Sequence, residues 1–365
     1  MIPVTKPYLP DRQKLEQYID GIYERGWLTN NGPLVKELTA RLEEYLGVEN
    51  LLLVANGTLA LQVAYRTLGV SGHQYAEKPE AITTPFTFIA TASSLAWDGV
   101  KPVFVDIDAD SWCLDPKNIV SAITANTRAI VPVHVFGNPC DVDFIGDVAR
   151  HHNLKVIYDA SHAFGVNYKG ESLLGYGDAS TLSFHATKLF HTVEGGAIVF
   201  RRKEDLERAK AMINFGITGP ESIQELGINA KMNELQAAVG LCVLDEMQEN
   251  IEGRSRVSNF YRRHLSNLVS FQASNDESSS NESYAPVLLE TESQVESIKR
   301  ELEASGIGAR RYFYPSLESF DFLGAGERLP VSTDVAGRIL CLPLYCDLDA
   351  ETQKRIVKII ENEVG

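Results

Sequence analysis

The chain of 365 residues is poor in positive charge and has no long apolar run. Its 34 lysines and arginines stand against 49 aspartates and glutamates, a formal net charge of −15. This deficit argues against non-specific binding to nucleic acid or anionic membranes, which requires basic surface. No apolar segment approaches the roughly 20 residues of a membrane span. The first residues, MIPVTKPYLP, lack the zones of a signal peptide, so we expect a cytoplasmic protein.

Cysteine is also scarce, and its five copies form no C-x-x-C pair. An odd number of dispersed cysteines is typical of reduced, mostly structural thiols. The best candidate zinc ligands have a spacing that matches no recognised site: His134, Cys140, His151 and His152. We therefore predict a functional site without a metal.

The first two thirds of the sequence alternate strand-like apolar runs with helical segments. The predicted strands are nearly all apolar, as in sheets covered on both faces, and they lie at 51–54, 81–84, 102–106, 129–136, 155–159, 180–184 and 197–200. Helical periodicity appears between them, for example at 57–68 and 142–152. This alternation predicts an α/β fold with a mainly parallel sheet.

The pattern changes after Arg201. Residues 232–265 are predicted to form one long helical stretch, with Gly253 as its candidate break, and the serine-rich residues 270–283 an exposed loop. Strand and helix patterns follow at 284–290, 292–305, 308–314, 338–344 and 351–364. We predict a large domain, residues 1–250 including an N-terminal arm, and a small α+β domain, residues 251–365.

Polar or aromatic residues follow several predicted strands, and ligands of parallel sheets bind at the carboxyl ends of strands. Asn56, Gly57 and Thr58 end one strand and open a helix. They form either an ordinary N-cap or a phosphate site, because helix N-termini carry free amides and partial positive charge. Phe86 and Phe88 follow the next strand, either as core residues or as a surface that stacks on a flat heterocycle.

Two charged residues complete the pattern. Asp159 ends a strongly apolar strand, where a carboxylate either caps the next turn or pairs with a cationic ring nitrogen. Lys188 follows Ser183 in a turn that leads to Gly195 and Gly196. A solvated lysine needs no such setting, whereas an amine attacks a carbonyl only after desolvation or neighbouring charge has lowered its pKa.

Together these features match one cofactor. A phosphate cradle, an aromatic plate, a carboxylate for a pyridinium nitrogen and a lysine for a Schiff base are the requirements of pyridoxal 5′-phosphate. The lysine would both bond to the cofactor and move a proton. The residues therefore predict a pyridoxal-phosphate enzyme.

The order and spacing of the motifs resemble the DegT/DnrJ/EryC1/StrS sugar aminotransferases. The resemblance covers nearly the whole chain, through ANGTLAL, TPFTFIATASS, DASHAFG, SFHATK…EGGAIVF, GINAKMNELQAAVG and RRYFYPSL. It implies a fold-type I aminotransferase with a large, mainly parallel-sheet cofactor domain and a small C-terminal α+β domain. It also implies a homodimer whose active sites are shared across the interface.

The resemblance implies roles for single residues. Lys188 would carry the cofactor, Asp159 would pair with its ring nitrogen, and Phe88 rather than Phe86 would stack on its ring. His162, at a position that is often glutamine in the family, would lie near the phenolic oxygen. The implied phosphate-binding residues are Gly57, Thr58, Ser183 and the partner subunit's Asn229. The implied substrate-binding residues are Thr29, His185, Arg311, Tyr312 and Tyr314.

The resemblance also suggests a reaction. A related sugar dehydratase has histidine where this chain has Lys188, so the lysine favours transamination. The FHATK…EGG pattern resembles family members that aminate C4 of a nucleotide-linked 4-keto-6-deoxyhexose. We expect L-glutamate to aminate dTDP-4-keto-6-deoxy-D-glucose, with the cofactor alternating between pyridoxal and pyridoxamine phosphate. The alternatives are C3 amination of a dTDP-3-keto-6-deoxyhexose and a pyridoxal-phosphate-binding sensor or scaffold without turnover.

Overall fold

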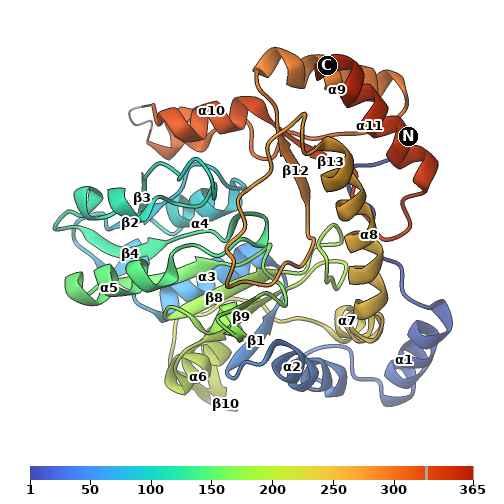
Figure 1. The fold of residues 1–365 in the computed structure, drawn as a ribbon. Helices are drawn as coiled ribbons and strands as arrows, with labels where there is room; N and C mark the ends of the chain where they lie inside the picture. The colour runs from blue at the N-terminus through green and yellow to red at the C-terminus, as the bar shows by residue number, and fades with distance from the viewer. Residues whose placement is uncertain (325–327, 365) are drawn as a thin grey trace.

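The centre of the molecule is a seven-stranded sheet of order β1-β9-β8-β5-β4-β2-β3 (Figure 1). The computed structural model describes residues 1–324 and 328–364. The strands of this sheet are β1 (Leu51–Val54), β2 (Glu80–Thr83), β3 (Lys101–Phe104), β4 (Thr127–Val131), β5 (Lys155–Asp159), β8 (Ala179–Ser183) and β9 (Gly196–Phe200). All neighbours pair in parallel except β9, which is antiparallel to both β1 and β8. The predicted mainly parallel sheet is confirmed.

Helices cover both faces of the sheet, which explains the nearly continuous apolar strands. Leu52 and Ile157 pack with α3 and α6, whereas the adjacent Leu53 and Val156 belong to the cluster that includes α2 and α5. The α-helices are α1 (Arg12–Arg25), α2 (Pro33–Leu46), α3 (Gly57–Thr67), α4 (Ala90–Trp97), α5 (Val142–His152), α6 (Lys203–Met212), α7 (Glu234–Asp245), α8 (Met247–Leu265), α9 (Glu292–Ala304), α10 (Pro330–Arg338) and α11 (Ala350–Val364). The predicted helices at 57–68 and 142–152 correspond to α3 and α5.

Short elements connect these parts. Two-stranded pairs are formed by β6 (Asn167–Tyr168) with β7 (Glu171–Ser172), β10 (Ile217–Gly219) with β11 (Ser222–Ile223), and β12 (Ala285–Leu288) with β13 (Ile339–Leu342). Single 3₁₀ turns occur at η1 (Gly72–Gln74), η2 (Pro116–Asn118), η3 (Val120–Ala122), η4 (Val135–Gly137), η5 (Leu173–Gly175), η6 (Leu317–Ser319) and η7 (Asp321–Leu323).

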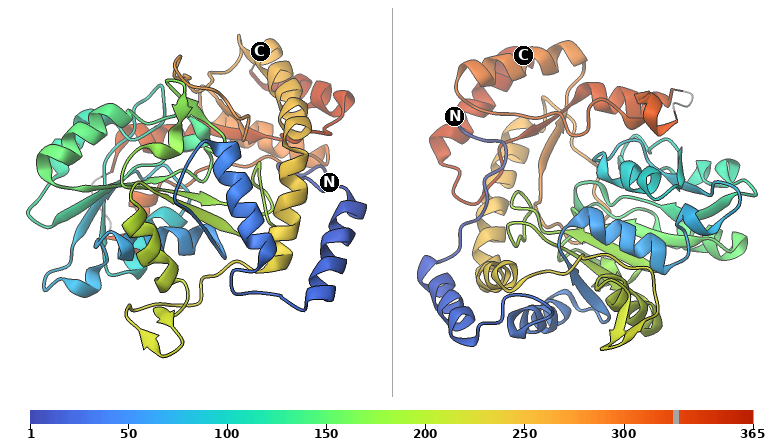
Figure 2. Two further views of the ribbon diagram at one scale, coloured as in Figure 1. Left: turned by 90° about the horizontal axis from the view of Figure 1, so that it is seen from below. Right: turned by 180° about the vertical axis from the view of Figure 1, so that it is seen from behind.

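The C-terminal part has a hydrophobic cluster of its own, built from α8, α9, α11 and the β12–β13 pair. The first residues of the chain pack against this part, because Ile2 pairs with Ile307 and Lys6 forms an ion pair with Asp347 (Figures 1 and 2). The predicted boundary between residues 250 and 251 lies inside α8, which is continuous from Met247 to Leu265. The division into two domains stays a prediction.

Two predictions of secondary structure were wrong. The break in the stretch 232–265 falls at Glu246 rather than Gly253. A Cβ at Gly253 would lie 2.5 Å from the Cβ of Cys346, so this glycine permits close packing inside a helix. The predicted strand at 308–314 forms only one isolated bridge, from Arg310 to Cys341. Arg310, Tyr312 and Phe313 line one cavity instead, and Tyr314 lines another.

Residues 270–284, which we call the strap, run across the sheet and lack regular structure (Figure 1). The buried polar side chains at its C-terminal end bind backbone groups of the sheet region. Asn281, 4% exposed, donates to the carbonyl oxygens of His162 and Phe164, and Ser283 also donates to His162. The expectation of an exposed loop was therefore wrong at this end of the strap, because each buried polar group finds a backbone partner.

The sequence predicted no membrane span, unpaired cysteines and no metal site. Over residues 1–324 and 328–364, no helix is long and apolar enough to cross a membrane. All five cysteines are free thiols. In the same ranges no group of three or more His, Cys, Asp or Glu side chains is arranged to hold a metal. His134 instead accepts a hydrogen bond from the amide of Cys140, and burial lowers its pKa to about 3.

Candidate active site

A cavity of about 320 Å³ lies at the carboxyl edge of the central sheet. The ends of β1, β5 and β8 bring Asn56–Thr58, Asp159 and Ser183 to it, and the turn after β8 adds Lys188. These are residues that the sequence placed after separate strands. The cavity-lining residues are Asn56, Gly57, Thr58, Leu61, Thr87, Phe88, Ala90, Val133, Asp159, Ser161, His162, Ser183, His185, Thr187, Lys188, Glu194, Tyr284, Arg310, Tyr312 and Phe313.

The end of β1 and the start of α3 form an anion cradle. Asn56 caps α3, with its side chain accepting from the amide of Leu59 at 2.9 Å. The amides of Gly57 and Thr58 precede it at the start of the helix and have no partner within the helix, so they can donate to an anion. A Cβ at Gly57 would lie 2.8 Å from the Cβ of Ser183. Glycine is therefore needed for the approach of these two segments, and Thr58 adds an exposed hydroxyl.

Asp159 is held by hydroxyl and amide donors. It is 5% exposed, and its Oδ2 accepts from Thr91 at 2.7 Å. Its Oδ1 accepts from the hydroxyl of Ser161 at 2.6 Å and from the Ser161 amide at 3.1 Å. The sequence left two roles open for Asp159, capping the next turn or pairing with a ligand. Both are possible at once, because Oδ1 caps the turn while the carboxylate lines the cavity. Within the described residues no cationic side chain forms an ion pair with it, and the sequence did not indicate Thr91 or Ser161.

Lys188 points its amine at a phenol from a distant segment. Its Nζ donates to the hydroxyl of Tyr284, the last residue of the strap, at 3.1 Å. Burial lowers the pKa of Lys188 to about 8, against smaller opposing effects of Asp159 and Tyr312. Burial also raises the pKa of Tyr284, so the phenol stays protonated and the amine is the group that changes charge near neutral pH. Tyr284 was missed by the sequence because nothing local distinguishes it from a strand tyrosine.

The two candidate aromatic residues, Phe86 and Phe88, differ in burial. Phe86 is fully buried and packs edge-on against Phe136 and Phe313, so it is a core residue. Phe88 is 50% exposed and lines the cavity. A ligand ring could therefore stack on Phe88 but not on Phe86.

His162 is buried beside the cavity in a defined hydrogen-bonding state. Its Nδ1 lies 3.2 Å from the backbone amide of Phe136, which can only donate. Its ring lies parallel to those of Phe136 and Phe313. Burial, with a smaller effect of Lys188, lowers the pKa of His162 well below its usual value, so the ring is neutral. Because Nδ1 accepts, Nε2 carries the proton and is a donor.

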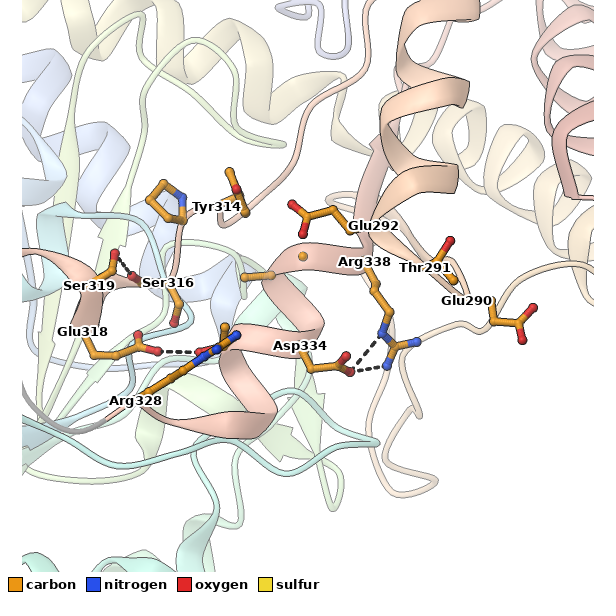
Figure 3. A pocket seen from close by; sticks show the side chains of 14 residues that line it. Glu290, Thr291, Glu292, Tyr314, Ser316, Glu318, Ser319, Arg328, Asp334 and Arg338 are labelled. Carbon is orange, nitrogen blue, oxygen red and sulfur yellow. Dashed lines mark hydrogen bonds and ion pairs between the residues drawn. The ribbon is translucent and has the colours of Figure 1, made fainter.

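The predicted substrate residues divide into two groups. His185 and Tyr312 line the cavity, and His185 contacts Thr187. Arg311 and Tyr314 do not: Arg311 pairs with Glu292 at 2.6 Å, and Tyr314 lines a separate cavity of about 750 Å³ (Figure 3). The segment 310–316 runs between the two cavities, so neighbouring residues face opposite sides.

Two further predicted residues, Thr29 and Asn229, are exposed and outside the cavity. The backbone around Asn229 runs beside the end of β1, because the amide of Ala55 donates to the carbonyl of Ala230. The cavity contains two charged residues that we did not single out, Glu194 and Arg310. Adjacent arginines cannot be assigned to a cavity from sequence alone, because the facing depends on the backbone path.

A doubly covered, mainly parallel sheet with a partly buried lysine, a carboxylate and an anion cradle at its carboxyl edge defines an enzyme of the fold-type I aminotransferase class. The chain belongs to the DegT/DnrJ/EryC1/StrS aminotransferase family, whose sequence profile matches residues 10–361. Members of this family are pyridoxal-phosphate-dependent sugar aminotransferases.

Individual relatives agree with this assignment over almost the full chain. The dTDP-4-amino-4,6-dideoxy-D-glucose transaminase of Shigella dysenteriae is 43% identical over 364 residues, covering 98% of this chain and 97% of the relative. The Escherichia coli protein of the same name is 36% identical over 378 residues and 98% of each chain. The crystal structure of DesI in the presence of its TDP-sugar product gives a TM-score of 0.91 at 33% identity, covering 99% of this chain and 92% of that one.

Proposed function

We propose that the protein transfers the amino group of L-glutamate to C4 of dTDP-4-keto-6-deoxy-D-glucose, forming dTDP-4-amino-4,6-dideoxy-D-glucose. The observation that carries the aminotransferase chemistry is the amine of Lys188, whose pKa is lowered to about 8 in the cavity that also contains Asp159. The 43% identity to the Shigella dysenteriae transaminase supports the choice of sugar.

The residues of the cavity fit pyridoxal 5′-phosphate. The α3 amides, Thr58 and Ser183 would hold its phosphate, in a cradle that a Cβ at Gly57 would fill. Asp159 would pair with its ring nitrogen, and Phe88 would stack on its ring. When bound, the cofactor supplies an electron sink for the charge that develops when the donor loses its Cα proton.

Each protein group has a defined task in this reaction. Lys188 accepts the proton from Cα of the donor, and it can do so because about one tenth of it is neutral at pH 7 for a pKa of about 8. The hydroxyl of Tyr284, 3.1 Å from the amine, holds it in place while it is free. Asp159, fixed by Thr91 and Ser161, places its carboxyl group where a cationic ring nitrogen would need it.

His162 would donate a hydrogen bond to the phenolic oxygen of the cofactor. The glutamine that often stands at this position in related sequences is a neutral donor. His162 is also a neutral donor, because the Phe136 amide occupies Nδ1 and leaves the proton on Nε2. The replacement therefore keeps the hydrogen-bonding character of the site.

We further propose that the active protein is a homodimer. Large apolar side chains are exposed in two stretches, residues 27–28 and 215–235: Trp27, Leu28, Phe215, Ile217, Ile223, Leu226, Ile228 and Leu235. The two stretches meet where the amide of Glu234 donates to the carbonyl of Leu28, and exposed apolar side chains that cluster in this way are typical of a subunit interface. Asn229 lies in the second stretch, which supports a role at the phosphate of the partner's site.

The test is a product analysis with labelled donor. The purified protein, pyridoxal phosphate, L-[¹⁵N]glutamate and dTDP-4-keto-6-deoxy-D-glucose should give a sugar whose ¹⁵N couples to C4 in the NMR spectrum. A parallel reaction with a dTDP-3-keto-6-deoxyhexose tests the alternative, which would place the ¹⁵N label at C3. No label in any sugar would contradict the proposed function, and dTDP-glucose, which has no keto group, is the matched negative control.

A further inference from the structure

Among the described residues that line the cavity, Arg310 is the only arginine, and it forms no ion pair with an acidic residue of that part of the chain. Within residues 1–324 and 328–364, no carboxylate lies within ion-pair distance of its guanidinium, whereas the adjacent Arg311 is paired with Glu292. Arg310 is exposed and lines the cavity. Of the other basic side chains in the cavity, Lys188 is partly neutral, His162 is uncharged, and His185 lies 3.7 Å from the carboxylate of Glu194. Arg310 therefore supplies a permanent positive charge.

Contacts hold both the backbone and the guanidinium of Arg310 in place. Its backbone amide donates to the carbonyl of Cys341 at 3.2 Å, and the amide of Cys341 donates back at 2.8 Å. Its guanidinium lies over the ring of Tyr312, 4.6 Å from the centroid. Stacking of this kind holds the planar group without using its N–H donors. All of these donors remain available to an anion.

Arg310 lies on the same wall as the reacting amine. The ring of Tyr312 packs edge-on against Tyr284 at 5.6 Å between centroids, and Tyr284 contacts the amine of Lys188. The anion cradle of α3 and Ser183 is built from a different part of the chain, the ends of β1 and β8. Arg310 is therefore a second, separately anchored anion-binding group in this cavity.

Arg311 provides an internal comparison. Its guanidinium donates to Glu292 and to the carbonyl of Gly337 at 2.8 Å, on the far side of the segment 310–316. Glu292 lines the larger outer cavity in Figure 3, together with Tyr314. The donors of Arg311 are thus used within the protein, and those of Arg310 are not.

We propose that Arg310 is the residue that binds a carboxylate of the amino donor, a proposal that rests on the function given above. A planar guanidinium binds a carboxylate through two parallel hydrogen bonds. The cavity of about 320 Å³ is at the lower end of the usual range of ligand sites, so beside Lys188 it suits a small dicarboxylic acid better than a nucleoside diphosphate.

The test separates the two half-reactions of the holoenzyme. Stopped-flow absorbance follows the cofactor band after mixing with L-glutamate, and separately the return of that band after mixing the aminated enzyme with the keto sugar. For Arg310→Met we expect the half-saturating glutamate concentration to rise roughly 10- to 100-fold, as for loss of a charged hydrogen-bonding partner. The half-saturating keto-sugar concentration should change less than about threefold.

Two further variants sharpen the result. Arg310→Lys keeps the charge but not the fork, and should recover part of the glutamate affinity. Arg311→Met should change neither half-saturating concentration by more than about threefold. Thermal melting and the content of covalently bound cofactor establish that each variant is folded before the kinetics are compared.

The proposal would be overturned if Arg310→Met changed the half-saturating concentration of the keto sugar instead of that of glutamate. A rise in the keto-sugar constant with an unchanged glutamate constant would show that Arg310 binds the nucleotide, and unchanged constants in both halves would show that it binds neither. A glutamate effect in Arg311→Met alone would move the role to its neighbour. If the wild type reacts with glutamate but never passes nitrogen to the keto sugar, the proposed function fails while the role of Arg310 is still measured.

Discussion

The cavity has two walls of different origin. One, which we call the cofactor wall, is made by strand ends and a helix start: Asn56–Thr58, Asp159 and Ser183. The other, the substrate wall, is made by Tyr284 at the end of the strap and by Arg310 and Tyr312 from the segment before β13. The first is fixed by the sheet, and the second by long-range contacts of irregular chain.

This difference indicates that the strand ends hold the cofactor and that the irregular segments select the substrate. Groups on strand ends cannot move relative to one another without breaking the sheet, so they suit a cofactor that must be held in one orientation. Loops on a rigid scaffold can differ in residue and path, so they suit the choice of substrate. Changes in the cofactor wall should therefore affect all turnover, and changes in the substrate wall should affect concentration dependence.

The largest effect should come from Lys188, which lies between the walls. Lys188→Ala removes both the attachment point and the proton carrier, and we expect turnover to fall by about 10⁴-fold or more. The fold should be intact, because no core contact is lost. Product formation by chromatography measures the effect, and Lys117→Ala, an exposed lysine outside the cavity, should retain full activity. Turnover at the normal rate in Lys188→Ala would show that another amine acts.

The next effect tests the cofactor wall alone. Asp159→Asn keeps the size and much of the hydrogen bonding to Thr91 and Ser161 but removes the charge. We expect a loss of roughly 10²- to 10³-fold in the rate of the glutamate half-reaction, with little change in its half-saturating concentration. A variant whose main defect is instead a higher half-saturating concentration would break the distinction between the two walls.

A third change tests how tightly the cofactor wall is closed. Gly57→Ala places a methyl group 2.8 Å from the Cβ of Ser183, and overpacking of this kind costs about 1–3 kcal/mol. We expect cofactor affinity, measured by titrating the apoprotein with pyridoxal phosphate, to weaken about 10- to 100-fold. Gly175→Ala is the matched control, because its Cβ would meet nothing within 4 Å. Equal affinities in the two variants would refute the close-approach argument.

The smallest expected effect, less than about tenfold between pH 8 and pH 7, is a pH dependence of cofactor capture by the apoprotein. Only the neutral amine of Lys188 attacks an aldehyde, and its pKa is lowered to about 8. The rate should fall about tenfold for each pH unit well below 8 and level off above it. Stopped-flow absorbance over pH 6 to 10 measures this profile. A rate that keeps rising to pH 10 would mean that the substrate wall does not desolvate the lysine.

Much of the fold and of the cofactor wall could be predicted from the sequence. Apolar runs fixed the strands, and the residues after them, Gly57, Asp159 and Lys188, had to meet because parallel strands share a carboxyl edge. The break at Glu246 could not be predicted, since the glycine that suggested a break at 253 is required by packing against Cys346. The anchoring of Asn281 was equally hidden, because its partners lie more than 100 residues away.

The sequence by itself determined the reactive residue types and their order along the strands, because strand and helix periodicity is local and strand ends coincide in a parallel sheet. Only the tertiary structure decided which of Phe86 and Phe88 is free, which of Arg310 and Arg311 faces the cavity, and that Tyr284 contacts Lys188. The physical reason is that side-chain direction in irregular chain follows from long-range packing and hydrogen bonds, which no local pattern encodes.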